Sequence, residues 1–172
     1  MQTKPSLIRN NTHPLLSQIT NNTTLWIGHL QTDPFDHFAG QTFECPANGR
    51  LDNIQVFASV VQEDGEVGLT LHEFDNTGNS WGPAITEASN FVEKGNDDAR
   101  WLRFSLQPVD LKKNAVYGFR LKTTNAMVGL GEAASFSHQP FAFGHEWTAD
   151  SGNEKGYYLR YFSLAFKVEL CA

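Results

Sequence analysis

The feature that most constrains the fold is a strict alternation of residue types near the end of the chain, between residues 160 and 171. One side of a two-residue period carries Phe162, Leu164, Phe166, Val168 and Leu170, and the other side carries Tyr161, Ser163, Ala165, Lys167 and Glu169. A period of two places successive side chains on opposite faces of a β-strand. This segment therefore predicts a long strand with one face in a core and a wetter face opposite.

Similar alternation recurs along most of the chain, with turn-forming residues between the alternating runs. Residues 51–61 and 67–71 show it, and the Glu63-Asp64-Gly65 segment between them has the composition of a hairpin turn. No segment has a convincing helical period. About ten short strands at roughly ten-residue spacing are typical of a sandwich or barrel. We therefore predict an all-β chain, a two-sheet antiparallel β-sandwich of the jelly-roll type, with less than about a tenth of its residues in helix.

The chain reads as one domain preceded by a polar segment. A length of 172 residues is sufficient for a single core. Residues 1–24 are rich in Asn and Thr and lack periodicity, whereas residues 25–172 carry the alternating runs. We predict an N-terminal arm or tail over residues 1–24 and a single β-sandwich domain over residues 25–172. We also expect the first ~20 residues to be dispensable for folding, as loose termini are.

Charge and hydropathy indicate which classes of partner and which compartments are compatible with the chain. The net charge is −6 and the Lys and Arg residues form no basic stripe, so we expect no nucleic-acid partner. No apolar run approaches the roughly 18 residues of a membrane span. Residues 1–24 lack the apolar core of a signal peptide, so the protein is either cytoplasmic or secreted with its leader removed. The sequence does not determine the oligomeric state.

The two cysteines leave the redox state open. Cys45 and Cys171 each end a predicted strand. If those strands are neighbours, a disulfide can form; otherwise both residues are ordinary free thiols.

An ordered set of strand motifs resembles a known class of domain. It comprises residues 41–43, Gly49 to Ile54, Leu69 to Asp75, Trp81-Gly82-Pro83, Trp101 to Phe104, Val116 to Leu121 and Leu164 to Val168. Across residues 38–170 this order resembles bacterial jelly-roll modules of the galactose-binding-like, carbohydrate-binding kind, often appended to carbohydrate-active enzymes. The resemblance implies sugar binding and, as in many such modules, a structural calcium ion. No residue motif in this chain locates either site.

Signatures of catalysis are largely absent. The chain has no Gly-x-Ser-x-Gly elbow, phosphate-binding loop or dinucleotide fingerprint. His29 with His37, or His138 with His145, would form a metal site only if they met in space. The carboxylates Glu132, Glu146 and Asp150 could line one rim as a glycosidase pair, or simply lie in solvated loops.

Aromatic and cationic residues offer a better candidate site. Trp81 lies in a loop rich in Gly and Asn, and Trp147 precedes the polar loop that Tyr157 and Tyr158 end. Flat rings with a polar edge suit the C–H faces of sugars, although the same rings could cap the end of a sandwich. Alternation also predicts outward-facing residues on separate strands: His72, Trp101, Arg103 and Arg120. If those strands share a sheet, the four side chains could bind a hydroxylated or acidic ligand, or form an ordinary solvated face.

These patterns favour a non-catalytic carbohydrate-binding or carbohydrate-associated module. The predicted ligand-binding residues are Trp81, Trp147, His72, Trp101, Arg103 and Arg120. Two alternatives stay open: a structural or assembly protein that contacts other chains through aromatic loops and edge strands, and a small jelly-roll enzyme acting on sugars.

Overall fold

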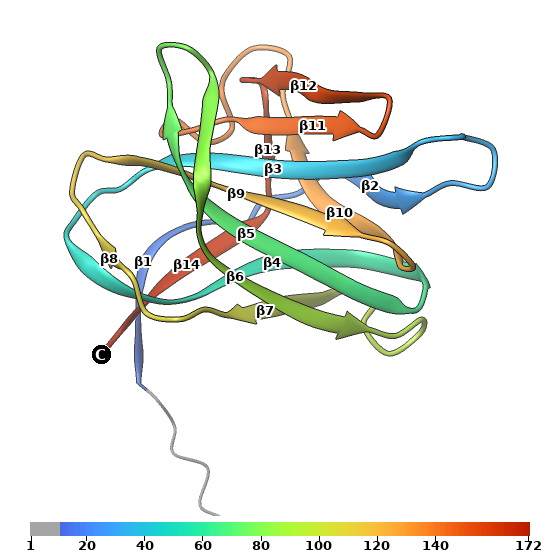
Figure 1. The fold of residues 1–172 in the computed structure, drawn as a ribbon, viewed down its shortest axis with the longest axis horizontal. Helices are drawn as coiled ribbons and strands as arrows, with labels where there is room; N and C mark the ends of the chain where they lie inside the picture. The colour runs from blue at the N-terminus through green and yellow to red at the C-terminus, as the bar shows by residue number, and fades with distance from the viewer. Residues whose placement is uncertain (1–10) are drawn as a thin grey trace, which may run out of the picture.

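The computed structural model describes residues 11–172, which form fourteen strands and no helix (Figure 1). The strands are β1 (Thr12–Gln18), β2 (Thr23–His29), β3 (Asp36–Glu44), β4 (Gly49–Glu63), β5 (Gly65–Asp75), β6 (Ser80–Val92), β7 (Arg100–Ser105), β8 (Asp110–Leu111), β9 (Val116–Thr123), β10 (Met127–Ala134), β11 (Glu146–Asp150), β12 (Asn153–Leu159), β13 (Phe162–Leu164) and β14 (Phe166–Cys171). The predicted all-β class is confirmed for the described residues. None of them forms a helix of the length and hydropathy that a membrane span requires.

Hydrogen bonds join the strands into one open antiparallel sheet. Its main path runs β1-β14-β4-β10-β2-β3-β9-β5-β6. Five pairings lie off this path: β7 and β8 pair with β4, β13 pairs with β10, and β11 pairs with both β3 and β12. The 15-residue strand β4 has several partners: β14 and β7 pair with overlapping stretches, residues 51–56 and 53–58, and β10 pairs with residues 58–63.

The sheet encloses a single hydrophobic core. Phe166 of β14 is fully buried, and its ring centroid lies 5.6 Å from that of Phe119 in β9 and 6.3 Å from that of Phe43 in β3. Neither β9 nor β3 is a neighbour of β14 in the strand order. The sheet therefore curves back so that distant strands meet across the core.

The alternation at the end of the chain is correct in its central part. Leu164, Phe166 and Val168 are fully buried as expected, but Ser163 and Ala165 are also buried, and Phe162 and Leu170 are only partly buried. The Ala165 N–H donates to Gly131 O and its carbonyl accepts from the Phe57 N–H. Because these bonds lie outside the two flanking ladders, the predicted single strand is divided into β13 and β14.

The predicted amino-terminal arm contains a strand of the sheet. Strand β1 lies within the predicted arm and pairs with β14, and the boundary expected after residue 24 falls inside β2. Residues 1–10 of the predicted arm lie outside the described residues.

Cys45 and Cys171 are both free thiols, so the disulfide alternative is not realised. Their strands, β3 and β14, are not neighbours.

Candidate functional site

Four of the six predicted site residues converge on the outer face of β3, β9 and β5. The ring centroids of His72 and Trp81 are 5.5 Å apart, and those of Trp81 and Trp147 are 5.4 Å apart. The Arg120 Cζ lies 4.7 Å from the Trp81 ring centroid and 5.6 Å from that of Trp147. They come from β5, β6, β9 and β11. In Figure 1 the loop end of the β5–β6 hairpin and the β11–β12 hairpin lie at the same end of the molecule, which explains the convergence.

The other two predicted residues lie elsewhere. Trp101 and Arg103 are in β7, which pairs with β4 and not with β5 or β9. The Trp101 ring packs against Phe57, with centroids 5.3 Å apart, and Lys167 Nζ lies 4.1 Å from its centroid. Arg103 Nη2 donates to Asp52 Oδ2 over 2.9 Å. The structure therefore does not bring these two side chains to His72 and Arg120.

The four converging residues belong to a larger group, here called the outer aromatic cluster. It consists of His72, Phe74, Trp81, Arg120, His145, Trp147 and Tyr158. The indole N–H of Trp81 donates to the Tyr158 hydroxyl over 3.1 Å, and that of Trp147 donates to Lys155 O over 3.0 Å. Trp147 is only 1% exposed and lies in a strand. Its ring is therefore packed inside the cluster, and its face is not available for stacking.

Two glycines allow the indole rings to pack closely against the sheet. A Cβ atom at Gly118 would lie 2.6 Å from the Trp81 ring, and one at Gly40 would lie 3.0 Å from the Trp147 ring. Gly40 and Gly118 each neighbour residues of the cluster in the β3–β9–β5 register. Any larger residue would lift the rings off the sheet.

The polar groups of the cluster are arranged around a neutral imidazole. His72 Nδ1 lies 2.8 Å from Gly82 O, which can only accept, so Nδ1 carries the proton. His72 Nε2 then accepts from the Thr70 hydroxyl over 2.7 Å. Burial lowers the pKa of His72, His145 and Arg120 from their ordinary values. Among the described residues no carboxylate lies within ion-pair distance of Arg120.

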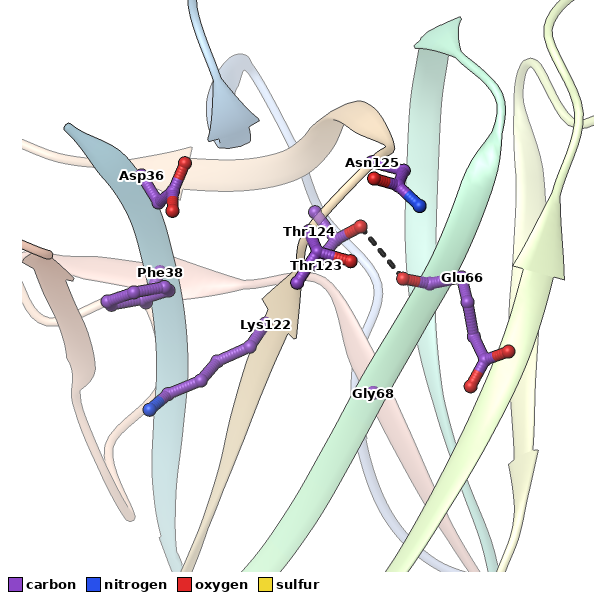
Figure 2. Close-up of a pocket in the computed structure, with 8 residues that line it drawn as sticks. All are labelled: Asp36, Phe38, Glu66, Gly68, Lys122, Thr123, Thr124 and Asn125. Carbon is purple, nitrogen blue, oxygen red and sulfur yellow. Dashed lines mark hydrogen bonds between the residues drawn. The ribbon is translucent and has the colours of Figure 1, made fainter. Parts of the chain in front are cut away.

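Beside the cluster the same sheet face carries an open depression, shown in Figure 2. Its volume is about 600 Å³, and it is lined by Asp36, Phe38, Glu66, Gly68, Lys122, Thr123, Thr124 and Asn125. A second depression of about 420 Å³ shares Glu66 and Gly68 with the first and continues past Thr70 to Glu87 and Ser89. We call the two together the outer groove. Thr70 connects it to the outer aromatic cluster through the hydrogen bond to His72.

The floor of the outer groove is shaped by Gly68. A Cβ atom there would meet nothing closer than Lys122 O at 3.8 Å, so the space above Gly68 is open. Lys122 extends across the face, with its Nζ 4.8 Å from the Phe38 ring centroid. The Thr123 hydroxyl donates to Glu66 O over 2.8 Å, which fixes the two strands at one end of the groove.

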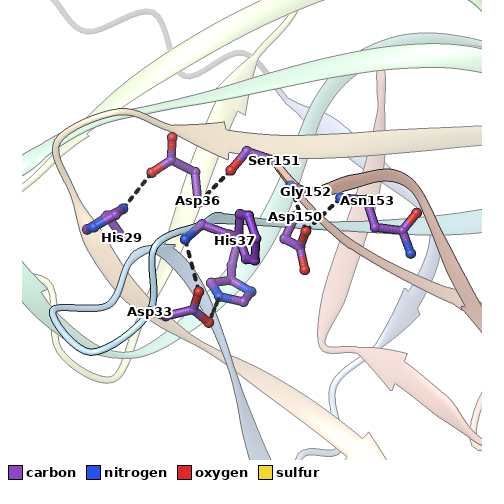
Figure 3. A network of polar contacts seen from close by, with 9 residues as sticks. His29, Asp33, Asp36, His37, Asp150, Ser151, Gly152 and Asn153 are labelled. Atoms are coloured by element: carbon purple, nitrogen blue, oxygen red, sulfur yellow. Dashed lines mark hydrogen bonds and ion pairs between the residues drawn. The ribbon is translucent and has the colours of Figure 1, made fainter.

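The three carboxylates predicted to line a rim do not do so. Glu132 and Glu146 are interior residues, 5% and 0% exposed. The pKa of Glu146 is raised to about 11, mainly by burial and in smaller part by the adjacent Glu132. Asp150 ends β11, and its Oδ1 accepts from the backbone N–H groups of Gly152 and Asn153 in the turn that follows (Figure 3).

The histidine pairs that would form a metal site only by meeting in space each bond to other partners. His29 bonds to Asp36 over 3.0 Å and His37 bonds to Asp33 over 2.7 Å, each in its own pair (Figure 3). His138 contacts the hydroxyls of Ser135 and Ser137, whereas His145 contacts Thr42 and the rings of the cluster. Across residues 11–172 no group of three or more His, Cys, Asp or Glu side chains is arranged to hold a metal ion.

The outer groove was not predicted from the sequence, although its signal was present. Phe38, Gly68 and Lys122 occupy outward positions of the alternating strands, but such residues are typical of any solvated sheet face. What distinguishes them is their position next to one another across β3, β9 and β5, which depends on strand pairing. In comparisons with known proteins, no family model and no curated protein matches this chain.

Proposed function

We propose that the protein is a non-catalytic carbohydrate-binding module whose ligand lies in the outer groove. The observation that carries this proposal is an open groove on a rigid sheet face, with a glycine floor and a mixed polar and aromatic wall. Sugars need hydroxyl partners of both kinds: Glu66 accepts, Lys122 donates, and Asn125 does both. Phe38 supplies an apolar surface for C–H groups.

The outer aromatic cluster supports this groove from one side. Its two indole N–H groups are already bonded within the protein, so the cluster behaves as a small second core. We propose that it holds Thr70 and Arg120 in place, with the open edge of the Arg120 guanidinium available to ligand oxygens. Of the residues predicted from the sequence, His72, Trp81 and Trp147 are then positioning residues.

We further propose that the curved sheet is best understood as a two-layer jelly-roll sandwich. Contacts between Phe166 of β14 and the rings of Phe43 and Phe119 support this arrangement, since these strands meet across the core. In that arrangement β3, β9 and β5 form one layer, whose outer face carries the groove. Outward-facing sheet surfaces of this kind are suited to extended ligands.

The direct test is to titrate a panel of neutral and acidic glycans by calorimetry and by NMR chemical-shift mapping. We expect affinities nearer millimolar than nanomolar, because sugars give up good hydrogen bonds to water on binding. Gly68→Val fills the groove floor at a position without positive φ, where a Cβ atom is accommodated. We expect it to weaken binding by about tenfold or more without loss of stability, since Val favours strands.

Matched controls separate this site from other surfaces. Arg103→Ala removes an exposed cation on β7, away from the groove, and should leave binding unchanged. Binding that survives both Gly68→Val and Lys122→Ala would exclude the groove. Cleavage of any glycan by the pure protein would replace the binding proposal by hydrolysis, with Asp36 and Glu66, which line one depression, as the carboxylates to substitute.

A second candidate, an assembly role, is favoured by exposed aromatic side chains near β11. Phe136 is fully exposed, Phe143 is 65% exposed, and Tyr157 is 65% exposed. Exposed rings mark a contact between chains where they form one contiguous patch. Sedimentation equilibrium tests this role directly: an oligomer that Phe136→Ser with Phe143→Ser dissociates would support it, and a monomer at all concentrations would contradict self-assembly.

A further inference from the structure

Glu132 and Glu146 meet in the interior of the fold although both are acidic. Glu146 lies opposite Gln41 in the β3–β11 register, and Glu132 lies opposite Leu164 in the β10–β13 register. The Oε1 of Gln41 accepts from the Leu164 N–H over 3.0 Å, which ties the two registers together. Ser163 completes this buried polar group, with its hydroxyl donating to Leu164 O over 2.9 Å. Both carboxyl groups are buried, and both oxygens of Glu146 lie in the interior without a hydrogen-bond partner among the described residues.

An ionised carboxylate can only accept hydrogen bonds, and no donor reaches either oxygen of Glu146 among the described residues. An unpaired buried anion is costly, and a second anion beside it adds repulsion. One proton on the pair would remove a charge and would also supply the O–H donor that the geometry lacks.

No cation on the surrounding strands neutralises the pair. The titratable or charged residues on the strands packed against β10 and β11 are His29 on β2; Asp36, His37 and Glu44 on β3; Arg50, Asp52 and Glu63 on β4; Asp150 on β11 itself; and Glu154, Lys155, Tyr157 and Tyr158 on β12, with none on β13. His29 and His37 bond to Asp36 and Asp33, and Lys155 is exposed. Glu132 is the only one of the described groups that acts on the titration of Glu146.

We propose that Glu146, buried beside Glu132 without a hydrogen-bond partner, keeps a proton in the folded protein, so that the fold is more stable at lower pH. The folded state then retains a proton that the unfolded chain releases above pH 4.5, the ordinary value of a Glu pKa. Because the folded Glu146 pKa is raised, its contribution to stability is fully present below pH 4.5 and is lost progressively as the pH rises toward 11. The pair lowers the folding equilibrium constant by up to about tenfold per pH unit across this range.

The test is chemical denaturation of the full chain between pH 5.5 and 8, comparing wild type with Glu146→Gln. The amide introduced by this substitution can donate to Glu132 but does not titrate. The difference in folding constant between the two proteins therefore separates the effect of the pair from that of other titrating groups. We expect the ratio of their folding constants to change about 100-fold over two pH units in favour of the variant. Glu154→Gln, at an exposed position of β12, is the matched control and should behave as wild type.

Three further measurements test the same proposal. Glu132→Gln should reduce the pH dependence only in part, because the burial that is the main cause of the raised Glu146 pKa remains; this variant also covers the case that Glu146→Gln fails to fold. At pH 7.5 the wild type should show the infrared carbonyl band of a protonated carboxylic acid, and Glu146→Gln should lack it. A parallel pH dependence of wild type and both variants, or no such band, would overturn the proposal. Stabilisation of wild type alone by added Ca²⁺ or Mg²⁺ would also overturn it, in favour of a cation between the two carboxylates.

Discussion

Replacing Phe166 with Ala tests the packing of the core most directly. Phe166 is fully buried in β14, and three aromatic rings surround it: Phe43 at 6.3 Å, Phe119 at 5.6 Å and Phe141 at 5.2 Å between centroids. Burial of a Phe side chain contributes about 1.5–3 kcal/mol, and each aromatic pair adds about 0.5–1.5 kcal/mol. The surrounding rings come from three different segments, so the cavity cannot close easily. We expect a loss of about 4 kcal/mol in the free energy of unfolding, within the usual range of about 3–5 kcal/mol for such changes.

The assay is urea denaturation followed by circular dichroism, with Phe143→Ala as the control. Phe143 is the same residue type and neighbours Phe141, but it is 65% exposed, so its replacement should cost less than about 0.5 kcal/mol. A double-mutant cycle of Phe166→Ala with Phe119→Ala should show coupling of about 0.5–1.5 kcal/mol, since the rings touch across the core. A loss below about 1 kcal/mol for Phe166→Ala would mean that the face assignment of β14 is inverted and that the packing argument fails.

Two other predictions concern the outer aromatic cluster and the amino terminus. Gly118→Ala should cost about 1–3 kcal/mol and change the tryptophan emission spectrum, because the new Cβ would lie 2.6 Å from the Trp81 ring; unchanged emission would mean that the ring has room to move. A chain beginning at Thr23 should still fold but lose about 1–3 kcal/mol in urea denaturation, because it lacks β1 and leaves the β14 edge unpaired; failure to fold would make β1 an essential strand.

The alternation of residue types predicted the buried faces of β5, β7 and β9, although it missed β1 within the expected arm. Leu69 and Leu71, Leu102 and Phe104, and Tyr117 and Phe119 were all expected to point inward, and all six are buried. This succeeds because the side-chain period of a strand is a local property. Whichever strands become neighbours, the apolar face must be covered.

Strand partners could not be predicted, because pairing is set by contacts between residues distant in sequence. Trp101 and Arg103 have the same outward alternation as His72 and Arg120, yet β7 pairs with β4 on another part of the sheet. Glu146 was expected at a rim or in a solvated loop, but β11 pairs with both β3 and β12, which places its side chain in the interior. The sequence therefore indicated the residue types of the site without indicating which of them meet.

Thr70 offers a way to separate the roles of the outer groove and the outer aromatic cluster. Its hydroxyl donates to His72 Nε2 over 2.7 Å, and its own position lines the groove. Thr70→Val keeps the shape and the strand preference of the side chain but removes this bond. We expect a stability loss of about 1 kcal/mol, the usual contribution of one hydrogen bond.

If the cluster positions the groove wall, the same substitution should weaken glycan binding several-fold, because His72 and Arg120 lose a fixed neighbour. Calorimetric titration of Thr70→Val beside Gly68→Val distinguishes the two effects. Gly68→Val should weaken binding at unchanged stability, whereas Thr70→Val should lower both. Unchanged binding in Thr70→Val would show that the aromatic cluster is only a second core, and that the groove works without it.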